Sequence, residues 1–191
     1  ISDFSAPQLL FLGLTVIVMK SVEITRDVII IGAGAAGMFC AAECARRGRS
    51  VLVLDHALRA VSKVRISGGG RCNFTNLNAG ADHYQSNNPH FCKSALARFT
   101  PRDMLALVSR FHIAYYEKEA GQIFCRDTAR ELAGMLEREC AGVELRLDCT
   151  VQRVAREEEG FAVVTETSIF RSQSLVIATG GLSYPNLGAS P

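Results

Sequence analysis

The chain has 191 residues and a formal net charge of +2 at pH 7, with 48% hydrophobic and 21% charged residues. This length suits one domain with a substantial core, and the lack of a basic block interleaved with aromatic residues argues against a nucleic-acid partner. Seven cysteines without a C-x-x-C pair favour neither a disulfide framework nor a zinc site, so we expect no metal site and a cytoplasmic protein.

The first residues differ from those that follow. The chain starts at Ile1, and residues 9–18 form an apolar stretch that is too short to span a bilayer core of ~30 Å. Met19 stands shortly before the first strong motif. We therefore expect residues 1–18 to be translated upstream sequence that is absent from the native protein, and 19–191 to form the nucleotide-binding domain. The alternative interpretation of the apolar stretch is a membrane-surface anchor.

A strand, a glycine-rich turn and a helix follow. Residues 27–31 predict a strand, and residues 35–47 predict a helix. Between them lies a G-x-G-x-x-G turn, in which Gly32 permits the tight turn, Gly34 lets a pyrophosphate approach the backbone and Gly37 lets the helix pack on the sheet. The helix N-terminus would present free N–H groups and a positive dipole end to the phosphates.

A second apolar strand, residues 50–54, ends at Asp55. In a dinucleotide-binding βαβ unit a carboxylate at this position accepts a hydrogen bond from a ribose hydroxyl. Because FAD and NAD both carry that free hydroxyl, Asp55 fits either cofactor and disfavours only NADP. The complete order of strand, turn, helix, strand and acid makes this a strong fingerprint.

The next segment, residues 56–141, is longer than a minimal βαβ unit requires. It begins with a polar, glycine-rich run at 67–76 and then carries three helix signals. We expect N-caps at Asn88, Thr100 and Asp127. The apolar residues that would face inward on these helices are Phe91, Ala95 and Phe99 on the first, Met104, Leu105, Val108 and Phe111 on the second, and Leu132, Met135 and Leu136 on the third.

The last part of the chain has the alternating pattern of strands. Residues 143–147, 150–155 and 161–165 predict short antiparallel strands, and 175–177 predict a buried strand that enters a small-residue turn at 178–181. The sequence thus predicts an α/β, Rossmann-like dinucleotide-binding domain with a central parallel sheet, a helical insertion and a three-stranded antiparallel β-meander.

This order resembles that of FAD-binding flavoproteins of the glutathione-reductase type. Two runs, Ser67-Gly-Gly-Gly-Arg-Cys-Asn-Phe-Thr-Asn76 and Ala178-Thr-Gly-Gly-Leu-Ser-Tyr-Pro185, are similar to those of the BaiN/YhiN-like NAD(P)/FAD-dependent oxidoreductases, some of which are known as aminoacetone oxidases. The resemblance runs from about residue 27 to residue 189. Because that family continues further, we expect a substrate domain and a final flavin-contacting segment to be missing from the chain.

The resemblance implies FAD as the cofactor, with NAD(P)H as a candidate electron donor. The residues implied to contact FAD are Gly32, Ala33, Gly34, Ala36 and Gly37 at the pyrophosphate, Asp55 and the adjoining His56 at the adenosine, Lys63, Ser67, Gly69, Gly70, Arg71, Cys72 and Asn73 near the pyrophosphate and flavin, Val151 at the adenine, and Thr179, Gly180 and Gly181 over the cofactor.

Two of these residues invite chemistry of their own. Arg71, on a glycine-rich loop, suits a phosphate or the negative charge of a reduced flavin, unless it is an ordinary surface arginine. Cys72 is either a redox thiol or a packed one, and the absence of a nearby resolving cysteine favours the packed thiol. Cys40 and Cys44 share one helix face, and we expect both to be small buried residues.

The leading hypothesis is an FAD-dependent oxidoreductase that passes a hydride between a small-molecule substrate or NAD(P)H and the flavin. The alternatives are an NAD-dependent dehydrogenase and a fragment that binds a nucleotide without activity of its own. The meander and the turn at 178–181 favour FAD, since simple NAD dehydrogenases continue with further βα units. The sequence identifies no catalytic acid or base and no oligomeric state, and it gives no reason to expect a membrane partner.

Overall fold

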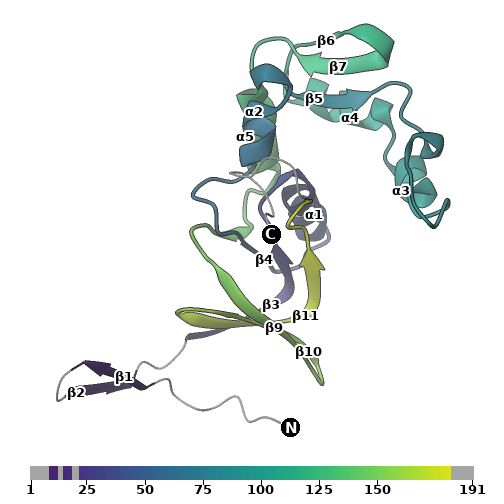
Figure 1. Cartoon of the computed structure of the whole chain (residues 1–191). Coiled ribbons are helices and arrows are strands. Elements are labelled where there is room, and N and C mark those ends of the chain that lie inside the picture. Colours follow the sequence, from purple (N-terminus) through teal and green to yellow (C-terminus); the bar gives the residue numbers. More distant parts are fainter. Residues whose placement is uncertain (1–8, 13–14, 19–21, 182–191) are drawn as a thin grey trace.

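The structure, a computed structural model, describes residues 9–12, 15–18 and 22–181. Its centre is a six-stranded sheet with the strand order β8-β4-β3-β11-β10-β9 (Figure 1). Four strands run parallel, namely β3 (Val22–Ile31), β4 (Val51–Leu54), β8 (Glu144–Arg146) and β11 (Ser168–Ile177). Two are antiparallel to their neighbours, β10 (Gly160–Thr165) and β9 (Val151–Glu157). The predicted fold class is confirmed.

Apolar cores lie on both faces of this sheet, which explains why its central strands are apolar throughout. Successive side chains of a strand point to opposite faces, so Ile30 and Val53 enter the larger core while Ile29 and Leu52 enter a smaller one with Phe170. The larger core is closed by two helices, α1 (Ala35–Arg46) and α5 (Ala129–Glu139).

The insertion forms a second sheet that the sequence did not predict. Its three antiparallel strands have the order β5-β7-β6, with the bounds β5 Asn73–Asn76, β6 Tyr115–Glu117 and β7 Gln122–Cys125. The helices around it are α2 (Ser62–Gly70), α3 (Lys93–Arg98) and α4 (Pro101–Arg110), with short 3-10 turns η1 (Ala81–His83) and η2 (Glu119–Gly121). Figure 1 shows this sheet at one end of α2 and α5, away from the larger sheet.

Two of the three predicted N-caps were wrong. The capping signal at Thr100 is confirmed, since Thr100 and Asp103 form a reciprocal capping box. Asn88 instead accepts a hydrogen bond from the His90 N–H in a local turn, and α3 begins only at Lys93. The cap of α5 is Thr128. Asparagine and proline favour turns as strongly as helix starts, which explains the first error.

The inward face predicted for the first insertion helix was also wrong. Phe91 is 54% exposed and Phe99 38% exposed, although the Phe99 ring meets Phe39 edge to face with centroids 4.9 Å apart. Figure 1 shows the short α3 at the outer end of the insertion. The predictions for α5 are confirmed, since Leu132, Met135 and Leu136 are buried.

The antiparallel meander exists, but one of its strands was misassigned. Residues 144–146 form β8, which pairs in parallel with β4 at the edge of the sheet. The meander consists instead of β9, β10 and the first half of β11. On its other side β11 pairs in parallel with β3 along its whole length, so one long strand belongs both to the meander and to the parallel part of the sheet.

Part of the predicted upstream segment forms a hairpin. Strands β1 (Leu9–Leu12) and β2 (Thr15–Val18) pair with each other antiparallel. The remainder of residues 1–18 and Met19 lie outside the described residues, as do residues 182–185 of the second family-like run. The expectation that residues 1–18 are absent from the native protein stays a prediction.

Candidate functional site

Two turns that are distant in the sequence meet at the carboxyl ends of β3 and β11. The Ala178 N–H donates to the Ile31 carbonyl at 2.7 Å. Gly32 has a φ of +111°, and a Cβ built on it would lie 2.3 Å from the Ala178 carbonyl oxygen. Only glycine allows this approach, so the first glycine of the fingerprint joins both turns at one edge of the sheet.

The helix α1 begins directly on this junction. A Cβ on Gly37 would lie 1.8 Å from the Gly32 carbonyl oxygen, so the helix rests on the turn through that glycine. Gly34 is the N-cap, without a capping side chain, and no atom of the described residues lies within 4 Å of a Cβ built there. Ala35 and Ala36 are exposed, and the N–H groups of a first helical turn lack intrahelical partners. The geometry therefore offers free donors beside open space.

Asp55 fastens the glycine turn to the end of β4. Its Oδ2 accepts from the Ala33 N–H at 2.5 Å and its Oδ1 from the Ala57 N–H at 2.8 Å. Ala33 therefore already uses its N–H within the protein. The neighbouring His56 is 72% exposed, with its Nδ1 3.6 Å from Asp55 Oδ1. The carboxylate thus shapes the loop, and its remaining lone pairs are available for a ligand.

The start of β9 reaches the same edge. The Cys149 N–H donates to the Asp55 carbonyl at 2.9 Å, which brings Val151, two residues further on, to the neighbourhood of Asp55. On the other side of the junction, Lys63 Nζ donates to the Gly181 carbonyl at 3.2 Å, while Thr179 and Gly180 are exposed. The structure thus gathers five separate chain segments around the N-terminus of α1.

The glycine-rich run that starts in the last residues of α2 is a compact loop. Gly68 and Gly69 have left-handed backbone conformations that break the helix, and the Cys72 N–H donates back to the Ser67 carbonyl at 2.9 Å. The run ends in β5, which begins at Asn73. Arg71 is exposed, and within the described part of the chain its guanidinium has no hydrogen-bond or ion-pair partner. It is therefore free to bind an anion.

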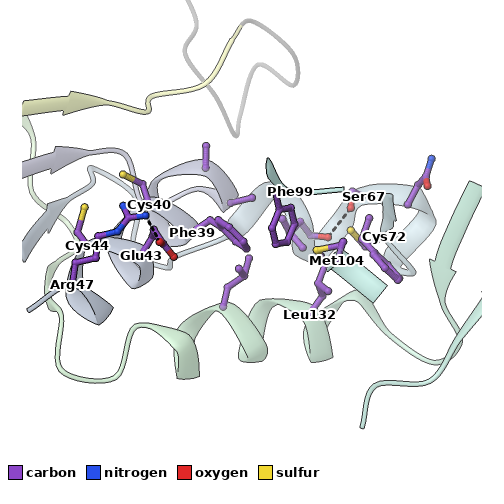
Figure 2. Close-up of a pocket in the computed structure, with 16 residues that line it drawn as sticks. Phe39, Cys40, Glu43, Cys44, Arg47, Ser67, Cys72, Phe99, Met104 and Leu132 are labelled. Atoms are coloured by element: carbon purple, nitrogen blue, oxygen red, sulfur yellow. Dashed lines mark hydrogen bonds and ion pairs between the residues drawn. The ribbon is translucent and has the colours of Figure 1, made fainter. Parts of the chain in front are cut away.

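A cavity of about 690 Å³ connects the helix start and this loop (Figure 2). Its lining includes Ala36, Ser67, Cys72 and Asn73, four of the predicted site residues. Sequence reasoning missed its apolar wall, which consists of Phe39, Val64, Phe74, Phe99, Met104, Leu132 and Leu136. The pattern assigned several of these residues to helix faces, but periodicity does not distinguish a core face from a cavity wall.

The cysteines near the site behave as packed thiols. Cys72 is 4% exposed, and burial raises its thiol pKa. This observation favours the packed alternative for Cys72 over a reactive thiolate. Cys40 and Cys44 are half-buried on the cavity side of α1 rather than fully buried as predicted. Burial, followed by the neighbouring Cys44 thiol, raises the pKa of Cys40.

We expect the free energy of unfolding to fall as the pH rises from 9 to 11. Burial raises the pKa of Cys125 from 9.0 to about 12 and that of Cys140 from 9.0 to about 11. Below pH 9 both thiols are protonated in both states, whereas above it only the unfolded chain ionises, which costs about 1.4 kcal/mol per pH unit for each thiol. Urea unfolding at pH 8, 9 and 10 measures this loss. The variant Cys125→Ala/Cys140→Ala should show a flatter pH dependence, and an unchanged dependence would contradict the assignment.

Comparison with known proteins identifies the family. Residues 26–191 match the HI0933-like protein Rossmann domain. The chain belongs to the HI0933-like family. Ribosomal RNA dihydrouridine synthase of Escherichia coli K12 is 52% identical over 167 residues, which cover 86% of this chain and 42% of that protein. The 3-dehydro-bile acid delta(4,6)-reductase of Clostridium scindens is 26% identical over 84% of this chain and 40% of its own length.

Solved structures agree with the family's fold. Glycine oxidase from Geobacillus kaustophilus superposes with a TM-score of 0.59 at 18% identity, over 82% of this chain and 56% of that one. The HI0933-like chain thus has the Rossmann-like fold of FAD-dependent oxidoreductases, as the resemblance implied. It spans 42% of the length of the E. coli relative.

The residues present fit an FAD. The open space at Gly34 and the exposed first turn of α1 provide room and donors for a pyrophosphate. Arg71 offers a free cation, and the cavity provides an apolar wall of the kind that ligand sites use.

Within the described ranges, no cluster of three or more His, Cys, Asp or Glu residues could hold a metal ion. None of the helices in those same ranges is both long enough and apolar enough to cross a membrane.

Proposed function

We propose that this chain is the FAD-binding part of a flavin-dependent reductase that acts on uridine in ribosomal RNA. The observation that carries the proposal is the 52% identity to a ribosomal RNA dihydrouridine synthase across 86% of the chain. Dihydrouridine is uridine with two hydrogen atoms added across a carbon–carbon double bond of the ring, so its formation is a two-electron reduction. The name of the C. scindens relative also describes a reductase.

The proposed roles of the residues follow from their positions. The N–H groups at the start of α1, beside Gly34, would hold the pyrophosphate, and Asp55 with Val151 would hold the adenosine end. Arg71 would approach a phosphate or the flavin, and the turn 179–181, steadied by Lys63, would lie over the cofactor. When bound, FAD would supply the two-electron redox chemistry. Each turnover would consume one NAD(P)H and one proton and add two hydrogen atoms to the uracil ring.

This proposal departs from the sequence-based expectation of a small-molecule substrate without nucleic acid. That expectation rested on the small net charge and on the pattern of basic residues. The name of the relative argues for an RNA substrate of the whole protein, and we give it more weight because the identity to that relative is high. The cytoplasmic location stays a prediction.

The full-length protein tests the proposal directly. We expect it to carry a visible flavin absorption that bleaches with NAD(P)H, and to add the mass of two hydrogen atoms to a uridine of ribosomal RNA taken from cells that lack the gene. RNA incubated without NAD(P)H is the control. A colourless protein that binds NAD would support the dehydrogenase alternative, and a flavoprotein that leaves ribosomal RNA unchanged would remove the RNA substrate.

Replacing Arg71 by glutamine should weaken FAD binding by about 1–2 kcal/mol, since one charge-assisted hydrogen bond to an anion would be lost at an exposed site. Fluorescence titration of the apoprotein with FAD measures the change. Arg130→Gln is the matched control, because Arg130 is also exposed but lies on α5, outside the glycine-rich loop. Equal affinities of the two variants would argue that Arg71 is an ordinary surface residue.

A further inference from the structure

The end of the insertion around α3 carries three cations between two flanking acids, Asp82 and Asp103. No aspartate or glutamate occurs in residues 83–102, whereas Lys93, Arg98 and Arg102 all lie there. These three side chains are exposed, and among the described residues none of them has an ion-pair partner. Other basic residues do, for example Arg65 with Glu137 at 2.5 Å. The three cations are therefore free to contact an anionic partner.

Two exposed aromatic side chains belong to the same segment of the chain. Tyr84 is 46% exposed and Phe91 54% exposed, and their rings meet edge to face with centroids 6.4 Å apart. Cys92, which is 8% exposed, anchors the segment next to Phe91. Exposed aromatic rings supported by such a contact offer surfaces on which unpaired bases stack. Residues 84–98 thus carry two exposed rings and, on the short helix α3, the exposed cations Lys93 and Arg98.

We propose that this surface, made of Tyr84, Phe91, Lys93, Arg98 and Arg102, binds single-stranded RNA. This inference rests on the proposed function, from which it takes ribosomal RNA as the substrate. It adds which part of the chain would hold that RNA. Cations that contact phosphates and rings that stack on bases are the combination by which proteins bind unpaired strands. A duplex would not present unstacked bases. Figure 1 shows α3 at the outer end of the insertion.

The charge contribution is tested with a pair of variants of the full-length protein. Lys93→Gln/Arg98→Gln removes two charges from the surface, and Arg49→Gln/Arg156→Gln removes two exposed charges elsewhere. Binding of a fluorescent uridine-rich RNA oligonucleotide is followed by anisotropy at several salt concentrations. We expect Lys93→Gln/Arg98→Gln to weaken RNA binding. It should also reduce the slope of log affinity against log salt by about 1.4, since each phosphate contact on a single strand contributes about 0.7. The control variant Arg49→Gln/Arg156→Gln should change neither the affinity nor the slope.

The stacking contribution is tested with aromatic variants. We expect Phe91→Ala to weaken RNA binding about 5- to 150-fold, which is the range for loss of one stacked base. Tyr84→Phe keeps the ring and should retain the affinity. Circular dichroism of each variant confirms that it is folded.

Three results would overturn the inference. One is equal weakening by both charge pairs, which indicates a general charge effect. Another is unchanged RNA binding in all variants. A third is unchanged RNA binding with altered sedimentation of Lys93→Gln/Arg98→Gln, which assigns the surface to a protein partner. The visible flavin spectrum, recorded on the same samples, separates this inference from the proposed function. If the protein is colourless but Lys93→Gln/Arg98→Gln still weakens RNA binding, only the flavin proposal is contradicted.

Discussion

Replacing Gly37 by alanine is expected to destabilise the protein by at least about 3 kcal/mol, above the usual cost of overpacking. The added Cβ would lie 1.8 Å from the Gly32 carbonyl oxygen and 3.4 Å from the Ala178 side chain. The first of these atoms belongs to the backbone of the fingerprint turn, so the helix α1 would have to move away from the sheet. Since small domains have only about 5–15 kcal/mol of stability, much of it would be lost. Thermal and urea unfolding followed by circular dichroism measure the change.

Two other glycines provide matched controls. Gly134 also lies inside a helix, but the nearest atom to its added Cβ is Arg138 Nη1 at 3.7 Å, so Gly134→Ala should stabilise the protein by about 0.5–1 kcal/mol. In Gly34→Ala the added methyl group meets no atom within 4 Å in the described part of the chain, so this variant should stay within about 1 kcal/mol of the parent protein. Because its methyl group would occupy the proposed pyrophosphate space, it should still lose flavin. A Gly37→Ala protein as stable as the Gly34→Ala protein would contradict the packing argument.

Replacing Asp55 by alanine is expected to lower the free energy of unfolding by about 2–4 kcal/mol and to abolish flavin retention. The carboxylate accepts from the Ala33 and Ala57 N–H groups, and its side chain is only 15% exposed. Hydrogen bonds to a charged acceptor contribute about 1.5–3 kcal/mol each, and removing the acceptor leaves partly buried donors without a partner. The loss of stability follows from the structure alone, whereas the loss of flavin tests the proposed ribose contact.

Asp55→Asn distinguishes these two effects. Asparagine keeps one oxygen acceptor but turns its other end into a donor, so it can satisfy only one of the two N–H groups and should cost about half as much stability. Urea unfolding of the apoproteins gives the first quantity, and the flavin absorbance of the purified proteins gives the second. An Asp55→Ala protein with parental stability would contradict the role of Asp55 in holding the turn.

The parts of the fold that the sequence predicted correctly are those with local signals. The fingerprint predicted α1, β4 and the second half of β3 to within a few residues. It could do so because an apolar run, glycines at fixed spacing and a terminal acid all lie within one short segment. The first half of β3 was not predicted. The capping box at Thr100 is local in the same sense. The sheet β5-β7-β6 escaped prediction because β5, Asn73–Asn76, is polar and consists of residues that favour turns.

The candidate site was predictable as a set of motifs but not as an arrangement. Gly32, Asp55 and Arg71 were each identified from their own surroundings. Two features depend on which segments meet after folding: Asp55 holds the Ala33 N–H, and Arg71 has no ion-pair partner among the residues that the structure describes. The same applies to the cavity wall formed by Phe39 and other apolar residues, because a cavity exists only between packed elements.

By itself, the sequence determined the class of fold, the fingerprint and the resemblance to a flavoprotein family, because spacing and hydrophobic period are properties of neighbouring residues. Only the tertiary structure decided that β8 pairs in parallel with β4 and that Phe91 is exposed. The tertiary structure also placed the Ala178 carbonyl oxygen 2.3 Å from the position of a Cβ built on Gly32. The physical reason is that pairing partners and burial are set by contacts between distant segments, which local periodicity does not encode.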